Sequence, residues 1–237
     1  MPETCPPLHR VAITLNAEAR AIQQVQCDLD HNAVRQCLEL LEDCNGKVVV
    51  TGMGKIGYVG QRFAATLAST GTPAFFVHPG EAQHGDLGML GDNDILVALS
   101  NSGKTREVYE MAYQAQRAFP LLPIVVFTGH ADSVLARYAT CLVSYGEINE
   151  ACPLGLTPTT SMAVVGALLD GIALAVMEQK GVTREQYARR HHGGYLGQKA
   201  RGHGTEGRAM KWRGQPLDLL SREELIECVA HLANRPV

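Results

Sequence analysis

The chain has 237 residues, 46% of them hydrophobic and 19% charged, and its 21 basic and 24 acidic side chains leave a net charge of −3. This composition indicates a globular protein with a buried core, and the balance of charge argues against non-specific nucleic-acid binding, which needs many lysines and arginines. Seven cysteines are scattered without a C-x-x-C pair, which disfavours a disulfide framework or a structural zinc site. Because the first residues also lack the profile of a signal peptide, we expect a reduced, cytoplasmic protein.

Most of the chain predicts alternating helices and strands. Helical periodicity over 16–29 and 32–42 precedes a series of short apolar runs, which are separated by further helical segments such as 105–119 and 133–138. The predicted strands are 47–51, 74–77, 94–99, 123–127 and 141–145. Strands that alternate with helices at this spacing pair in parallel through right-handed crossovers. The predicted fold class is therefore α/β, a three-layer α/β/α sandwich around a five-stranded parallel sheet.

After the fifth predicted strand the chain becomes helical. Residues 160–180 are apolar on almost every side, which predicts a helix buried in the core or at a subunit interface. A membrane span is disfavoured because the most apolar part, 162–177, is short and contains Asp170. Thr183 and Gln186 form a capping box that opens a further helix.

The last part of the chain has a different composition. Residues 202–214 are rich in glycine and charge and are predicted to be a linker, and Ser221 with Glu224 predicts the cap of a final helix over 222–233. We therefore predict a domain over residues 1–201, followed by a linker and a C-terminal helix over residues 202–237.

A glycine-rich turn follows the first predicted strand. Gly52, Gly54 and Gly57 form a G-x-G-x-x-G pattern between a strand and a helix, which is typical of dinucleotide-binding sites. Such a site also needs an acidic residue at the end of the second strand, where this chain has His78, and the turn itself contains Lys55. The sequence therefore disfavours a nicotinamide cofactor.

The third predicted strand leads into Ser100–Thr105, with the sequence SNSGKT, at the start of a helix. A nucleotide-binding P-loop is excluded because Ala98 stands where that motif needs glycine. Hydroxyl groups and backbone N–H groups at a helix N-terminus bind a single phosphate well, although these hydroxyls could instead only cap the helix. A second hydroxyl cluster, Thr157–Ser161, opens the long apolar helix, and two such clusters favour a phosphate ligand.

Five short segments carry a family pattern: GMGK, HPGEAQHGDLGM, SNSG, EACPLGLTPT and RHHGGYLG. In order and spacing they resemble the arabinose-5-phosphate isomerases of the sugar isomerase (SIS) fold, over about residues 10–200. The resemblance implies an enzyme that interconverts D-ribulose 5-phosphate and D-arabinose 5-phosphate, a step toward 3-deoxy-D-manno-octulosonate for lipopolysaccharide or capsule. It also implies a homotetramer and no obligatory cofactor.

The resemblance assigns four residues to catalysis, which are Lys55, Glu107, Glu150 and His191. An aldose–ketose isomerase needs a base that moves a proton between C1 and C2, and donors for the developing oxyanion. We expect Glu107 to be that base and His191 to open the sugar ring or exchange protons with the sugar hydroxyls. We expect Lys55 to supply positive charge to the phosphate or oxyanion, and Glu150 to orient Lys55 or a hydroxyl. Without the resemblance, each of the four has a purely structural interpretation. Lys55 could be a solvated turn lysine and Glu107 a helix N-terminal acid, while Glu150 could be a surface charge of a loop and His191 a surface histidine.

Other groups expected to contact the substrate lie in the same loops. They are Gly54, His84, Ser100, Asn101, Ser102, Thr105, Thr157 and Thr159. His78 and His84 bracket a loop with Glu81 and Asp86, but their spacing matches no standard set of metal ligands. No metal site is therefore predicted: we interpret these residues as substrate-pocket groups or as an adventitious metal-binding patch, and we assign His84 to the substrate pocket.

Departures from the family pattern keep two alternatives open. Ile56, Tyr58, Lys104 and His192 differ from the residues usual in the family, so an isomerase of another phosphosugar is the first alternative. A non-catalytic sugar-phosphate sensor is the second, although the first 45 residues lack the charge of a basic helix-turn-helix module. Many relatives continue into nucleotide-sensing CBS modules, and since only about 35 residues follow the isomerase region, we expect no such module here.

Overall fold

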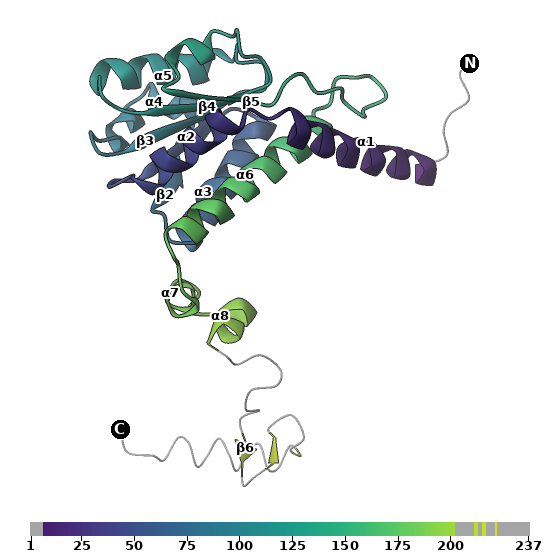
Figure 1. Ribbon diagram of the computed structural model, residues 1–237, viewed down its shortest axis with the longest axis vertical. Coiled ribbons are helices and arrows are strands. Elements are labelled where there is room, and N and C mark those ends of the chain that lie inside the picture. Colours follow the sequence, from purple (N-terminus) through teal and green to yellow (C-terminus); the bar gives the residue numbers. More distant parts are fainter. Residues whose placement is uncertain (1–6, 202–210, 213–214, 217–220, 222–237) are drawn as a thin grey trace. The chain divides into compact units, whose positions relative to one another are not determined.

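A computed structural model describes residues 7–201, 211–212, 215–216 and 221, and it divides the chain into two compact units, Met1–Val182 and Thr183–Val237. The first unit contains the sheet and the helices that cover it (Figure 1). Most of the linker predicted over 202–214, and the final helix predicted over 222–233, lie outside the described residues. Both stay predictions, as does the domain boundary after residue 201.

The first unit is built on a five-stranded parallel sheet with strand order β2-β1-β3-β4-β5. The strands are β1 (Val48–Gly52), β2 (Ala74–Phe76), β3 (Ile95–Leu99), β4 (Ile124–Thr128) and β5 (Cys141–Ser144). The three middle strands β1, β3 and β4 are buried along their whole length, which is why their sequences are continuous apolar runs. The predicted sheet is confirmed.

Helices cover both faces of the sheet, as the three-layer prediction requires (Figure 1). On one face lie α1 (Pro7–Asp28), α2 (His31–Glu42), α3 (Lys55–Ser69) and α6 (Thr160–Gln179). On the other face lie α4 (Pro79–Ala82), the 3₁₀ helix η1 (Asp86–Met89), α5 (Arg106–Ala118) and the 3₁₀ helix η2 (Leu135–Tyr138). Val48 and Val50 of β1 belong to the first core and Val49 to the second, because side chains alternate across a sheet.

Helix α1 begins at Pro7, earlier than the predicted start at residue 16. Its first turns leave Leu8, Val11 and Leu15 exposed by 86%, 57% and 61%. Helix α2 matches its prediction and is capped by Asp30, whose carboxylate accepts the N–H groups of Asn32 and Ala33. The early turns of α1 were missed because they bury no apolar stripe of their own.

Helix α6 is the apolar helix that the sequence predicts. By length and composition it is the one described helix that could cross a membrane, but half of that stretch is buried inside the fold. It packs against α3 and α1, beside which it runs in Figure 1. The apolar character of α6 therefore serves packing in the core.

The second unit is small in its described part. It contains α7 (Arg184–Arg190), α8 (Gly194–Ala200) and the antiparallel pair β6 (Lys211–Trp212) and β7 (Gln215–Pro216). The predicted capping box is confirmed, since the Thr183 hydroxyl accepts the Gln186 N–H and the Gln186 side chain accepts the Thr183 N–H.

The chain reverses its direction of winding between β1 and β3. These neighbours are in register to their last residues, where Gly52 pairs with Leu99. The helix after β1, α3, lies on one face of the sheet, and the helix after β3, α5, lies on the other. The two loops therefore diverge at the carboxyl ends of adjacent strands, which is the place where open α/β sheets bind ligands.

Gly57 allows α3 to start directly against the end of β1. A Cβ atom at this position would lie 2.6 Å from the carbonyl oxygen of Gly52 and 3.1 Å from its carbonyl carbon. The third glycine of the G-x-G-x-x-G pattern is therefore explained by close helix–strand packing, without a dinucleotide.

Gly57→Ala is expected to lower the free energy of unfolding by about 1–3 kcal/mol, because the added methyl group meets backbone atoms that cannot move aside. Urea denaturation followed by circular dichroism measures the change. Ala65→Gly, at an exposed position of the same helix, reports the cost of helix propensity alone, about 1 kcal/mol. A Gly57→Ala protein as stable as the original chain would contradict this packing.

Candidate active site

A cavity of about 470 Å³ lies where the loops after β1 and β3 diverge. Five residues that the sequence assigns to the site line it, which are Lys55, Asn101, Ser102, Thr105 and Glu150. They come from the start of α3, the loop before α5 and the loop between β5 and α6. Segments about 50 residues apart in the chain therefore share one hollow of a size typical for small-molecule sites.

The serine-rich loop before α5 has one buried and two accessible hydroxyl side chains. The Ser100 side chain accepts the N–H of Gly103 at 3.1 Å and lies 2.9 Å from the Thr105 hydroxyl. Because Ser100 is only 1% exposed, these contacts hold its hydroxyl within the loop, and its expected contact with a substrate stays a prediction. Ser102 is exposed and Thr105 half-buried, and both line the cavity.

The N-terminus of α5 opens toward this cavity. Thr105 is its N-cap, and within the described chain no side chain caps the N–H groups of the first turn. Unpaired N–H groups and the helix dipole favour an anion at such a position. The loop is therefore suited to a phosphate group, with the hydroxyls of Ser102 and Thr105 as additional donors.

Lys55 adds a positive charge to the same cavity. It is the first residue of α3 and is exposed, so its ammonium group is available to an anionic ligand. Gly54 before it has a φ of 69°, a left-handed conformation that favours glycine. Ile56, next to Lys55, is 7% exposed; it belongs to the core and also lines the cavity.

Glu150 caps helix α6 with its carboxylate. Oε2 accepts the N–H groups of Thr159 and Thr160, each at 2.8 Å, and Oε1 accepts the N–H and hydroxyl of Ser161. The structure thus places a negative charge of the protein itself at the start of α6. This anchors the loop between β5 and α6, whose residues Gly155, Leu156 and Pro158 also line the cavity.

The second hydroxyl cluster therefore differs from the first. The N–H groups at the start of α6 are engaged by Glu150, and the Thr159 hydroxyl is buried without a partner among the described residues. The Thr157 hydroxyl forms a hydrogen bond with the Cys152 thiol. Of the two hydroxyl clusters, the first, Ser100–Thr105, is therefore the one that supports a phosphate ligand.

Seven residues of the sequence-based set lie outside the cavity lining, which are Gly54, His84, Ser100, Glu107, Thr157, Thr159 and His191. Glu107 is half-buried in the first turn of α5, and His84 is exposed between α4 and η1. His191 belongs to the second unit, where it ends α7 and its ring stacks on Tyr187 with the centroids 3.9 Å apart. In the part of the chain that is described, no group of three His, Cys, Asp or Glu side chains is arranged to hold a metal ion.

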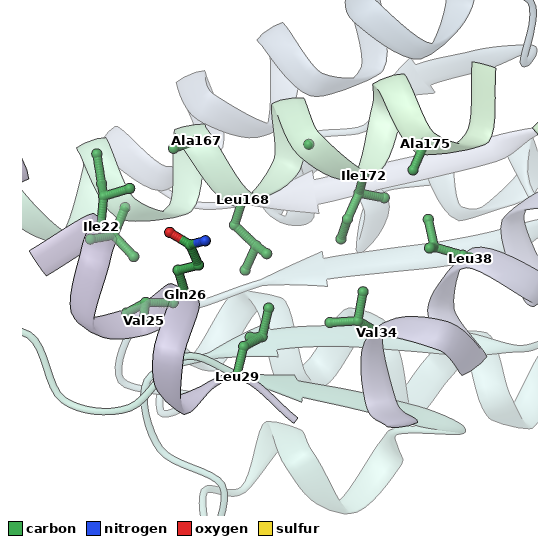
Figure 2. A pocket seen from close by; sticks show the side chains of 12 residues that line it. Ile22, Val25, Gln26, Leu29, Val34, Leu38, Ala167, Leu168, Ile172 and Ala175 are labelled. Atoms are coloured by element: carbon green, nitrogen blue, oxygen red, sulfur yellow. The ribbon is translucent and has the colours of Figure 1, made fainter. Parts of the chain in front are cut away.

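A second hollow, of about 360 Å³, has a different character. Figure 2 shows this apolar groove between α1, α2 and α6, with Ile22, Leu29, Val34 and Leu168 pointing toward one another. Gln26 is the one polar side chain among its lining residues. The apolar groove has no charged or catalytic group and is unsuited to a phosphosugar.

Cys152 is a further residue with altered reactivity, which the sequence did not predict. Its thiol lies within a turn of the loop between β5 and α6, near the Thr157 hydroxyl and the N–H groups of Thr157, Leu156 and Leu154. These hydrogen bonds, that of the Thr157 hydroxyl first, lower the pKa of Cys152 to about 6. Only the folded loop brings these donors together, so the sequence carries no signal for this reactivity.

Known proteins resemble this chain in both sequence and structure. The sequence model of the SIS domain matches residues 40–175. The arabinose 5-phosphate isomerase KdsD of Pseudomonas aeruginosa is 43% identical over 192 residues, which cover 81% of this chain and 58% of that protein. The chain thus spans somewhat more than half the length of the curated relatives that it matches.

Two solved structures are similar over nearly their whole length. One is a Bacteroides fragilis protein described as a candidate phosphosugar isomerase involved in capsule formation, with 41% identity, a TM-score of 0.74, and 78% of this chain and 97% of that chain covered. The other is an Escherichia coli CFT073 protein in complex with arabinose 5-phosphate, with 36% identity, a TM-score of 0.74, and 78% and 96% covered.

Cys152 is expected to react with iodoacetamide with a midpoint near pH 6, because the thiolate is the reacting form and an ordinary thiol has a pKa of about 8.5. Mass spectrometry of peptides after short pulses from about pH 5 to pH 9 measures the rate at this residue. Thr157→Val removes the largest cause of the lowered pKa and should move the midpoint upward. A midpoint near 8.5 in the original chain would exclude these hydrogen bonds.

Proposed function

Because this chain belongs to the SIS domain family, we propose that it is an aldose–ketose isomerase that interconverts D-ribulose 5-phosphate and D-arabinose 5-phosphate through an enediolate. The observation that carries the proposal is the cavity that combines the N-terminus of α5 with Lys55. The similarity to a KdsD isomerase and to a structure in complex with arabinose 5-phosphate supports the same substrate for this chain.

The phosphate group of the substrate binds at the start of α5 in this proposal. The Ser102 and Thr105 hydroxyls and the N–H groups of the first turn are its donors, while the buried Ser100 holds the loop in shape. The phosphate is remote from C1 and C2, so its binding energy can fix the reacting carbons in place without taking part in their chemistry. Gly54, Thr157, Thr159 and His84 stay expected substrate contacts.

Proton transfer between C1 and C2 is assigned to Glu107. A base removes a C1 proton of ribulose 5-phosphate, and the C2 oxygen gains negative charge. A proton then passes from the O1 hydroxyl to O2, and the proton returned to C2 leaves C1 as the aldehyde of arabinose 5-phosphate. Lys55 stabilises the charge that develops on oxygen, which a nearby ammonium group does best when water is excluded. Through its contacts with α6, Glu150 holds in place the loop between β5 and α6, which lines this cavity.

His191 is assigned to the aldose alone. Arabinose 5-phosphate closes to a furanose, so its ring must open before C2 becomes reactive, whereas ribulose 5-phosphate stays open-chain. An imidazole can exchange protons with the ring oxygen and hydroxyl groups near neutral pH. No cofactor is needed, because the reaction moves hydrogen within one molecule and leaves its oxidation state unchanged overall.

The place of the reaction follows from the same proposal. The product supplies 3-deoxy-D-manno-octulosonate for lipopolysaccharide or capsule, and the reaction takes place in the cytoplasm, where phosphosugars are held. Five free cysteines among the described residues agree with a reducing compartment. Residues 1–201 form the isomerase domain in this proposal.

A homotetramer is the assembly that we propose. The apolar groove between α1, α2 and α6 leaves hydrophobic side chains uncovered (Figure 2). Helix α1 also exposes Leu8, Val11 and Leu15. Under two-fold symmetry, a second copy can cover the groove with its own α1 while its groove is covered in return. This contact joins two copies and covers both surfaces at once, and the tetramer that the resemblance implies needs a second contact between two such pairs.

Proton NMR of D-ribulose 5-phosphate with the protein in D₂O tests the reaction. We expect arabinose 5-phosphate with deuterium at C2, and Glu107→Gln should lower kcat by about 10²–10⁴-fold, because it removes the base. Glu110→Gln, on the same helix and paired with Arg106, is the matched control and should keep its rate.

Two outcomes of this experiment would overturn the proposal. Exchange at C1 without arabinose 5-phosphate would favour an isomerase of another phosphosugar. Binding of D-ribulose 5-phosphate without any exchange of its protons with solvent would favour the non-catalytic sugar-phosphate sensor.

Analytical ultracentrifugation tests the assembly. The chain should sediment with the mass of four copies, and Leu168→Glu should lower that mass, because a carboxylate in the apolar groove opposes its burial. Leu121→Glu, at a position that is 94% exposed and outside the groove, should leave the mass unchanged. A monomer at micromolar concentration would exclude the tetramer.

A further inference from the structure

Tyr145 connects the end of β5 with the cavity. Its side chain is 5% exposed, and its hydroxyl donates a hydrogen bond to Oδ1 of Asn101 at 2.8 Å. Because β4 lies between β3 and β5 in the sheet, this contact passes across the end of β4. Gly129, just after β4, leaves the room for it: a Cβ atom there would lie 3.2 Å from Asn101 Oδ1 and 2.9 Å from the Gly146 carbonyl oxygen.

The main chain of Asn101 is also held in place. Its carbonyl oxygen accepts the N–H of Gly129 at 3.0 Å and the hydroxyl of Thr128 at 3.2 Å. Tyr145 is fixed in turn by its own N–H, which donates to the Thr128 carbonyl oxygen at 3.1 Å. The orientation of the Asn101 side chain therefore depends on the one contact that its amide makes with Tyr145.

The Tyr145 hydroxyl is the donor in this pair, and the Asn101 amide oxygen is the acceptor. Burial raises the pKa of Tyr145 well above its ordinary value, and the negative charge of Glu150 raises this pKa further. The phenol therefore keeps its proton across the working pH range. Because the amide oxygen accepts this hydrogen bond, the amide nitrogen of Asn101 is left on the opposite side.

The amide nitrogen of Asn101 is then directed at the ligand site. Asn101 lines the cavity together with Ser102, Thr105 and Lys55, and no described residue accepts a hydrogen bond from its Nδ2. All of these groups present hydrogen-bond donors, which suits an anionic and hydroxyl-rich ligand. If the amide turned by 180°, its oxygen would face the same anion and repel it.

We propose that Tyr145 is a positioning residue, whose hydroxyl holds the Asn101 amide with its N–H groups toward the bound phosphosugar. The inference rests on the proposed function for the identity of that ligand. Asn101 contacts the substrate, and Tyr145 acts only through Asn101. The contact is made with a part of the substrate that does not react, so it strengthens binding in the ground state and the transition state alike.

Tyr145→Phe removes the hydroxyl and keeps the ring in the core. KM for D-ribulose 5-phosphate should rise by about tenfold while kcat changes by less than about twofold, the pattern of lost uniform binding. Asn101→Ala should raise KM at least as much. Adding Tyr145→Phe to Asn101→Ala should then have no further effect, because the group that the hydroxyl positions is already gone.

Tyr138→Phe, at a half-buried tyrosine of η2, is the matched control and should keep both kinetic constants. The melting temperature of each variant reports any loss of stability separately from KM. An unchanged KM in Tyr145→Phe, a fall in kcat alone, or a KM effect that persists beside Asn101→Ala would each overturn the proposal.

Calorimetric titration with arabinose 5-phosphate separates this inference from the proposed function. If the original chain binds arabinose 5-phosphate without isomerising it, the proposed function fails, and a Kd about tenfold higher in Tyr145→Phe still supports the positioning role. If both chains bind with equal Kd, the positioning role fails, whatever the activity of the original chain.

Discussion

The divergence of two loops at the ends of β1 and β3 is the constraint on which the site depends. The strands end in register at Gly52 and Leu99, but α3 and α5 leave toward opposite faces of the sheet. Helices that followed the same face would close over the strand ends and leave no hollow. The strand order thus determines where the cavity lies, and the loops supply the functional groups that line it.

Three helix N-termini contribute residues to this cavity, and they differ in what caps them. At α6 the Glu150 carboxylate accepts the N–H groups of the first turn, so the protein supplies its own anion. At α3 and α5 no side chain among the described residues caps the first turn, and Lys55, the first residue of α3, adds a positive charge. These two N-termini are therefore the ones suited to an anionic group, and the proposed phosphate position uses that of α5.

The sheet was predictable because strands buried on both faces need continuous apolar runs, such as Val48–Gly52 in β1. The capping box of Thr183 and Gln186 was predictable for a similar reason, since both of its hydrogen bonds are local in the chain. The first turns of α1 were not predicted, although Leu8, Val11 and Leu15 stand at the helical spacing i, i+3 and i+7. These side chains are exposed, so the stripe that they form adds nothing to the core of the first unit.

For the site, the sequence by itself determined the residue types in each loop, and with them the family and the prediction of a phosphate-binding loop. Only the tertiary structure decided how those residues divide their work. It buries the Ser100 hydroxyl within the loop, turns the Glu150 carboxylate to α6, and brings Tyr145 across β4 to the Asn101 amide. The Glu150 contact spans the loop before α6, and the Tyr145 contact joins two strand ends that are far apart in the sequence. No local sequence pattern encodes which donor meets which acceptor once the strands are paired.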